Sequence, residues 1–146
     1  MADAVIKKAW DMVAQAKTEI ENLSAEQVKA ELDAGTAVIC DIRDFRERYL
    51  KGAIPGAFAL DRGMLEFWVD PASEYYRNLF TPDKRYILYC AAGGRSALSA
   101  KTMKDMGYQN VAHLESGFGG WEQASLPVED CKAGAKWVLK ADRTKG

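Results

Sequence analysis

Apolar residues recur at helical spacing near the start of the chain. From Val5 to Ile20 they are separated by steps of three and four residues, which describes one face of a helix. Ser24 and Gln27 form a capping-box pattern that predicts the start of a second helix, and Gly35 can end it in the left-handed conformation. We expect the first helix to pack on the outside of the domain and the second to turn its apolar residues inward.

Three short apolar runs lack helical spacing and predict strands that are buried on both faces. They are residues 37–42, 87–89 and 111–114. A helical stretch from Ser96 to Met106, closed by Gly107, separates the last two runs, so the order strand, helix, strand predicts a right-handed parallel crossover. The chain is therefore expected to adopt an α/β fold with helices on both faces of the sheet.

Two other segments depart from this pattern. Aromatic residues crowd positions 62–80, where Pro71 interrupts the chain, and we expect two short helices around that break, either capping the active-site mouth or docking a partner. Residues 132–146 contain five basic side chains and one acidic side chain, which is typical of a peripheral tail. The expected parts of the chain are a helical extension over 1–22, a domain over 23–128 and a basic tail over 129–146.

Composition and charge exclude several classes of function. A chain of 146 residues, 48% of them hydrophobic, can bury one ordinary core, and its net charge of −1 gives no general attraction to nucleic acid or to an anionic membrane. Charged residues interrupt any signal-peptide run at the start, and no stretch approaches the roughly 18 apolar residues of a membrane span. Cys40, Cys90 and Cys131 lack the spacing of a zinc site or a disulfide framework. We expect a cytoplasmic protein without metal or cofactor.

One cysteine lies where a predicted strand runs into a helix through adjacent glycines. Cys90 follows the strand, and Gly93 and Gly94 let the backbone turn tightly with its N–H groups facing inward. The dipole of the following helix adds positive character there, so we expect Cys90 to be substantially ionised at neutral pH. An isolated cysteine is more often a buried core residue, but the continuation Gly-Gly-Arg-Ser favours a nucleophile within an anion site.

Several segments, in this order, resemble the rhodanese family. Residues 40–47 and 52–57 are similar to its Asp-x-Arg, Glu and Gly-His-Ile-Pro-Gly-Ala pattern, and residues 90–96 match its Cys-x-x-Gly-x-Arg-Ser active loop. Residues 106–121 match its Gly-Tyr-x-x-Val, Leu, Gly and Trp segment. The resemblance covers residues 20–128 and implies a three-layer α/β/α sandwich around a five-stranded parallel sheet.

This resemblance also implies a sulfurtransferase. Cys90 would carry a persulfide, taking a sulfane sulfur from thiosulfate or a persulfide and passing it to a thiol or cyanide, and a protein donor or acceptor is a further option. The backbone of the next residues would bind the sulfur and the donor anion, and Arg95 would brace the loop or help to hold that anion. These cradle residues are Ala91, Ala92, Gly93, Gly94, Arg95 and Ser96.

Other polar residues are candidates for supporting roles. Asp41 and Arg43 follow a strand at the sheet edge where ligand crevices form in α/β proteins, or they form an internal ion pair that shapes the loop. Glu47, four residues after Arg43, could pair with it on one helical face. We expect His113 to serve packing or lie at the surface, and Cys40 to lie in the core.

This sequence departs from the rhodanese family pattern at two positions. Ala53 replaces the family histidine, which we expect to alter packing only, and Ala91 replaces a residue that is often basic, which predicts poor use of thiosulfate.

Related phosphatases have five residues between cysteine and arginine, whereas four separate Cys90 from Arg95. A partner-binding module or a sulfur carrier with little small-molecule turnover stays an alternative. The glycines at 117–120 lack a dinucleotide fingerprint and are set aside.

Overall fold

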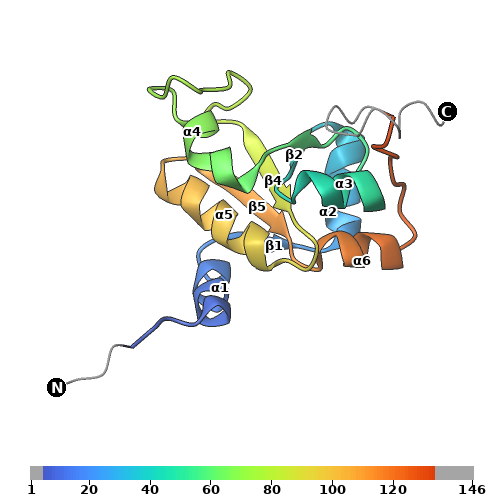
Figure 1. The fold of residues 1–146 in the computed structure, drawn as a ribbon, viewed down its shortest axis with the longest axis horizontal. Helices are drawn as coiled ribbons and strands as arrows, with labels where there is room; N and C mark the ends of the chain where they lie inside the picture. The colour runs from blue at the N-terminus through green and yellow to red at the C-terminus, as the bar shows by residue number, and fades with distance from the viewer. Residues whose placement is uncertain (1–4, 134–146) are drawn as a thin grey trace.

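The computed structural model describes residues 5–133 of the 146-residue chain. Its strands are β1 (Glu21–Leu23), β2 (Val38–Asp41), β3 (Phe58–Ala59), β4 (Arg85–Tyr89) and β5 (Asn110–Leu114). They form one sheet in the order β1-β5-β4-β2-β3, in which every neighbouring pair is parallel (Figure 1). The expected α/β class and five-stranded parallel sheet are confirmed.

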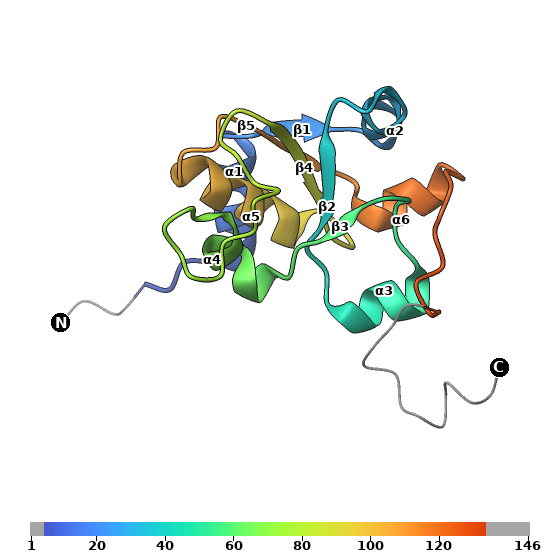
Figure 2. The ribbon, with the colours of Figure 1, turned by 90° about the horizontal axis from the view of Figure 1, so that it is seen from above.

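Helices cover both faces of this sheet, and Figure 2 shows one group of helices on each side of the strands. One layer contains α1 (Ala9–Lys17), α4 (Leu65–Val69) and α5 (Gly94–Asp105), and the other contains α2 (Ala25–Ala34), α3 (Phe45–Lys51) and α6 (Gly117–Gln123). The 3-10 turn η1 (Arg62–Met64) leads into α4. The molecule is therefore a three-layer α/β/α sandwich, as the family resemblance implies.

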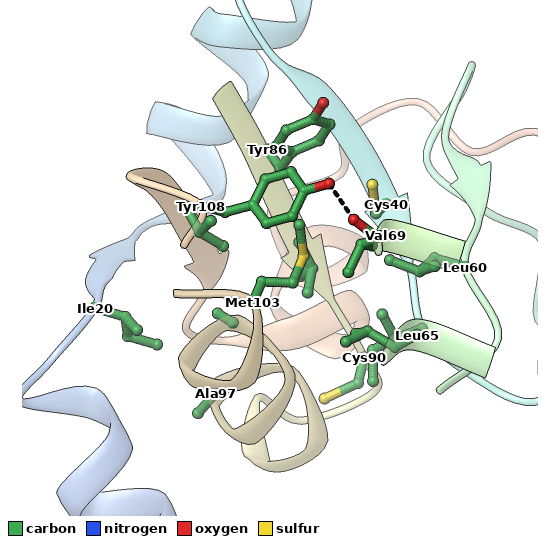
Figure 3. Packing of buried hydrophobic residues seen from close by; sticks show 14 of the residues in the cluster. Ile20, Cys40, Leu60, Leu65, Val69, Tyr86, Cys90, Ala97, Met103 and Tyr108 are labelled. Atoms are coloured by element: carbon green, nitrogen blue, oxygen red, sulfur yellow. Dashed lines mark hydrogen bonds between the residues drawn. The ribbon is translucent and has the colours of Figure 1, made fainter. Parts of the chain in front are cut away.

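Each face of the sheet has its own apolar core, and β4 contributes to both. Tyr86 and Leu88 lie in the core beneath α1, α4 and α5, whereas Ile87 and Tyr89 lie in the core beneath α2 and α6. Cys90 continues this alternation and belongs to the first core, which is shown in Figure 3. The period of the strand thus turns the cysteine toward the layer that contains α1 and α5.

The start of the domain differs from the sequence expectation in two ways. The first helix spans Ala9–Lys17 rather than residues 5–20, and the side chain of Asn22 donates to the carbonyls of Lys17 (2.9 Å) and Ile20 (3.2 Å) where the chain leaves α1. The chain then forms β1, an edge strand too short to produce an apolar pattern. Part of the expected extension 1–22 therefore belongs to the sheet.

The second helix follows its sequence signals closely. The Ser24 hydroxyl accepts from the Gln27 N–H at 3.1 Å, and the Gln27 side chain accepts from the Ser24 N–H at 2.8 Å. Gly35 ends α2 with a φ of 67°, in the left-handed region. The predicted capping box and glycine stop are confirmed, as are the three predicted strands and the helix between the last two.

The aromatic segment contains one short helix rather than two. After η1 and α4, the residues from Pro71 to Phe80 form turns, so the expected second helix is wrong. The Arg77 N–H donates to the Trp68 carbonyl at 2.9 Å, and the Tyr76 hydroxyl donates to the Phe80 carbonyl. These bonds satisfy the backbone without a helix, while Trp68 and Tyr76 pack against the first core.

Only the beginning of the expected basic tail lies within the described residues. Ala53 and Glu129 exchange backbone hydrogen bonds of 2.9 and 2.8 Å, so residue 129 is attached to the domain. The basic residues after position 133, on which the tail prediction depends, lie outside the described residues. Along residues 5–133, every helix is too short or too polar to cross a lipid bilayer.

Candidate active site

The nucleophile candidate lies in a tight turn between β4 and α5. Cys90 follows the last residue of β4, and Gly93 turns the chain with a φ of 97° immediately before α5 begins at Gly94. A Cβ atom at residue 93 would collide with the carbonyl oxygen of Glu115. Both the backbone conformation and the lack of space therefore require glycine at this position.

Two backbone N–H groups of this turn point at the sulfur. The N–H of Gly93 lies 3.1 Å from Sγ of Cys90, and the N–H of Ser96 lies 3.4 Å from it. Donors of this kind stabilise negative charge on the atom that accepts them, whether a thiolate or a persulfide bears it. The inward-facing N–H groups that the sequence predicts are present at two positions of the loop.

The first turn of α6 fixes the orientation of this loop. The N–H of Phe118 donates to the carbonyl of Cys90 at 2.8 Å, and the N–H of Gly119 donates to the carbonyl of Ala91 at 3.1 Å. A Cβ atom at Gly117 would collide with the backbone of Ala91, so these two segments touch. Sequence reasoning discarded the glycines at 117–120 as a cofactor loop and missed this role.

A chain of polar side chains, buried except for Asn22 at its end, extends from Cys90 across the sheet. The Ser96 hydroxyl lies 3.5 Å from Sγ of Cys90 and 2.9 Å from Nδ1 of His113, and Nε2 of His113 lies 2.8 Å from Oδ1 of Asn22. In the sheet, Asn22 of β1 pairs with His113 of β5, and His113 pairs with Leu88 of β4. Neighbouring parallel strands therefore bring residues 22 and 113 to the active loop.

The protonation state of His113 determines the direction of these hydrogen bonds. Burial, and then the charge of Lys17, lowers the pKa of His113 to about 4, so the ring is neutral at pH 7. Its Nε2–H donates to the side-chain oxygen Oδ1 of Asn22, because the NH₂ group of the same side chain already donates to backbone carbonyls. Nδ1 therefore accepts from the Ser96 hydroxyl, whose oxygen also lies 3.5 Å from Sγ of Cys90. The only sign of this connection in the sequence is a polar residue near the end of a predicted strand.

Arg95 is engaged by a carboxylate on α3. Its guanidinium donates to the two carboxylate oxygens of Glu47 at 2.7 and 3.0 Å, and these bonds hold the pKa of Glu47 below its usual value. Glu47 thus forms its ion pair with Arg95, and Arg43, which precedes the start of α3 at Phe45, acts on Glu47 only through its charge. Arg95 thus braces the loop against α3, one of its two expected roles.

A small pocket lies beside the sulfur. Its volume is about 290 Å³, and its walls come from the active loop, from α1 and from α5. The loop residues in the wall are Cys90, Ala91, Ala92, Gly94 and Arg95. The predicted loop residues therefore lie together, with Gly93 and Ser96 donating to the sulfur and the others lining the pocket beside it.

Comparison with known proteins assigns the family. Residues 24–124 match the model of the rhodanese-like domain. The chain belongs to the rhodanese-like domain family. The matched range contains α2 to α6, and α1, the helix that lines one side of the pocket, lies outside it.

Relatives of this rhodanese-like chain bear names connected with sulfur. It is 28% identical over 123 residues to a thiosulfate sulfurtransferase, GlpE, of Actinobacillus succinogenes, covering 84% of this chain and 86% of that protein. It is 30% identical over 117 residues to the putative sulfur carrier protein YrkF of Bacillus subtilis, covering 80% of this chain but only 58% of that protein.

A solved structure from Rhodopseudomonas palustris is more similar. It is described as a protein of unknown function and possible tyrosine phosphatase, with 46% sequence identity and a TM-score of 0.82, and the match covers 88% of this chain and 99% of that chain. Because the coverage extends beyond residues 24–124, this neighbour shares more of the chain than the rhodanese-like domain alone.

The pair Asp41 and Arg43 is internal to the rhodanese-like fold. Asp41 is fully buried and accepts from Arg43 (Nη2, 2.8 Å), Arg48 (2.8 Å) and the Tyr89 hydroxyl (2.9 Å). Burial alone would raise the pKa of Asp41, but the hydrogen bonds and charges of the two arginines outweigh it and lower the pKa. Arg43 also lies over the ring of Phe118, 4.3 Å from its centroid, and so supports α6. Of the two roles considered, the structure shows the ion pair.

The other two cysteines differ from Cys90 in their surroundings. Cys40 is fully buried in the first core, and burial, followed by the charge of Asp41, raises the pKa of its thiol. The expectation that Cys40 belongs to the core is confirmed. Burial also raises the pKa of Cys131, whose Sγ faces the Glu129 carbonyl at 3.7 Å. A thiol with a raised pKa is a weak nucleophile at neutral pH.

Proposed function

We propose that this chain is a sulfurtransferase that carries a sulfane sulfur as a persulfide on Cys90. The observation that carries the proposal is the pair of N–H groups, from Gly93 and Ser96, that face Sγ beside an open pocket. These groups stabilise negative charge at the place where both the thiolate and the persulfide bear it. The rhodanese-like family and the names of two relatives support the same chemistry.

The reaction consists of two displacements at sulfur. The Cys90 thiolate attacks the sulfane sulfur of a donor, a new S–S bond forms, and the donor's bond to that sulfur breaks with release of sulfite or a thiol. A thiol or cyanide then attacks the outer sulfur of the persulfide, and the Cys90 thiolate leaves with the electron pair. Kinetics of the ping-pong type are expected. A reducing compartment such as the cytoplasm suits a nucleophile that must stay a thiolate between turnovers.

Intact mass spectrometry tests the proposal directly. Incubation with thiosulfate or a small persulfide should add about 32 Da, one sulfur atom, to the wild type. Cys90→Ser should lose this addition, whereas Cys131→Ser, a matched change at another cysteine, should keep it. Labelling that persists in Cys90→Ser would contradict the assignment.

Turnover with cyanide separates an enzyme from a carrier. An enzyme should release thiocyanate repeatedly, while a carrier should accept one sulfur and keep it until a partner protein removes it. The name of the Bacillus subtilis relative supports keeping this second candidate. A partner that is retained equally by the wild type and by Cys90→Ser, with no sulfur loading in either, would indicate a docking module instead.

Phosphatase activity is the remaining rival, because the Rhodopseudomonas palustris structure is described with that possibility. Four residues separate Cys90 from Arg95, and both terminal nitrogens of Arg95 are bonded to Glu47 rather than directed at a phosphate. We therefore expect no Cys90-dependent hydrolysis of an aryl phosphate. Hydrolysis that Cys90→Ser abolishes would overturn this expectation.

A further inference from the structure

The pocket at Cys90 has an apolar wall that the rhodanese-like domain does not supply. Ala9, Trp10 and Val13 of α1 form one side, and Leu98 of α5 lies among the other lining residues. Cavities of about 150 Å³ accommodate a benzene molecule, so the 290 Å³ present here leaves room for an organic group of that size beside the sulfur. The space is thus larger than a sulfane sulfur alone requires.

Trp10 lies against the active loop and remains largely open to solvent. Trp10 is 68% exposed, yet its indole reaches the active loop. A Cβ atom at Gly94 would be only 3.0 and 3.1 Å from Cη2 and Cζ3 of the indole. Glycine at position 94 therefore permits the indole to cover the start of α5. A large aromatic surface, exposed beside a nucleophile, is suited to contact with an apolar part of a ligand.

Several contacts hold helix α1, which supplies this wall, against the rest of the domain. Val13 and Ala16 are buried against the first core, and Lys17 pairs with Glu115 at 2.6 Å. The Lys104 side chain donates to the carbonyl of Glu19 at 2.7 Å, just beyond the end of the helix. The helix is therefore held at its buried face and at its C-terminal end, and Trp10 is placed at its first turn.

The charges around the pocket disfavour a small dianion. Among the described residues that line it, Arg95 has the only charged side chain, and Glu47 already binds that guanidinium with two hydrogen bonds. An inorganic dianion gains little from a cation whose charge is paired. An apolar group gains free energy by leaving water for the space between Trp10 and Leu98.

We propose that this pocket selects sulfane-sulfur donors that bear an apolar organic group, namely organic persulfides, with the group packed on Trp10. The inference rests on the proposed persulfide chemistry of Cys90. The Cys90 thiolate attacks the outer sulfur of R–S–SH, the donor S–S bond breaks, and RS⁻ leaves with the electron pair. The proton of the transferred sulfur passes to RS⁻ through solvent, which yields RSH and the Cys90 persulfide anion. The sulfane sulfur keeps its oxidation state, so no further oxidant or reductant is needed.

Two thiosulfonates provide stable probes that differ only in the organic group. Benzenethiosulfonate and methanethiosulfonate share the reacting SO₂–S⁻ unit, and transfer of the outer sulfur releases a sulfinate from each. Thiocyanate formation with cyanide as the acceptor gives kcat/KM for both donors. In Trp10→Ala, the ratio of kcat/KM for benzenethiosulfonate to kcat/KM for methanethiosulfonate should be about tenfold lower than in the wild type. The two donors differ in intrinsic reactivity, but this difference is the same for the variant and the wild type and so cancels when their ratios are compared.

Met12→Ala is the matched control, because Met12 is a half-exposed apolar residue of α1 that lines a different groove. This variant should keep the wild-type ratio. An unchanged ratio in Trp10→Ala, or an equal fall in both variants, would overturn the pocket assignment while leaving sulfur transfer intact. Absence of sulfur loading from every donor in the wild type would instead refute the proposed function.

Discussion

The Ser96 hydroxyl lies 2.9 Å from Nδ1 of His113, and this contact joins the active loop to the neighbouring strand. Both residues are fully buried, so the hydrogen bond is shielded from water. Ser96 contributes to the site in two separate ways, since its backbone N–H faces the sulfur and its hydroxyl faces the imidazole. The two contributions can be separated by experiment.

Ser96→Ala removes the hydroxyl and keeps the backbone N–H. The unpaired Nδ1 of His113 should cost roughly 1–3 kcal/mol in the free energy of unfolding, measured by urea denaturation. Sulfur loading on Cys90 should persist, because the backbone donors to Sγ do not depend on this side chain. Complete loss of loading in a folded Ser96→Ala protein would show that the hydroxyl, rather than the backbone, stabilises the anion.

The buried imidazole of His113 should make stability depend on pH. Its pKa is lowered from 6.5 to about 4 in the folded protein, so between these values the unfolded chain binds more protons and stability falls as the pH falls. A difference of this size corresponds to roughly 3 kcal/mol. Urea unfolding between pH 7 and pH 4 should show this loss in the wild type.

His113→Gln removes the titrating ring and keeps polar atoms at the position. Its free energy of unfolding should be lower at pH 7 but should change less between pH 6.5 and pH 4 than that of the wild type. Parallel pH profiles for the two proteins would show that His113 does not titrate between pH 6.5 and pH 4. The difference between the two profiles is informative because carboxylate titration is common to both proteins.

Gly93→Ala tests the geometry of the loop. The substitution combines a backbone strain at φ 97° with a collision against the Glu115 carbonyl, and we expect a loss of at least about 2–4 kcal/mol together with loss of sulfur loading. Gly107→Ala is the control, because Gly107 has a φ of 113° but free space around a Cβ atom. It should lose about 1–2 kcal/mol and retain loading. Equal effects in the two variants would contradict the steric argument.

Glu47→Gln should release the charge of Arg95 for an anionic donor. The amide keeps the size of the carboxylate but no longer neutralises the guanidinium, so kcat/KM for thiosulfate should rise about fivefold at low ionic strength. The rise should shrink as salt is added. Glu66→Gln, at another carboxylate that pairs with an arginine, should leave the value unchanged. A decrease in Glu47→Gln would show that bracing of the loop outweighs the charge of Arg95.

The elements that the sequence predicts well are those with a local physical cause. The capping box at Ser24, the stop at Gly35 and the apolar strands arise from contacts within a few residues or from burial on both faces. The edge strand β1 depends on a distant partner, whereas the turns after Pro71 are formed by hydrogen bonds between residues a few positions apart, and neither segment contains a periodic apolar signal. For that reason β1 was missed and a second helix was wrongly expected in the aromatic segment.

By itself, the sequence determined the turn that carries Cys90, because the strand, Gly93 and the first turn of α5 are contiguous and their conformation follows from local sterics. Only the tertiary structure decided what surrounds that turn. The strand order brings His113 to Ser96, α3 brings Glu47 to Arg95, and the docking of α1 places Trp10 on Gly94. Each of these contacts joins segments far apart in the chain, and their pairing is set by the collective burial of two cores rather than by any local pattern.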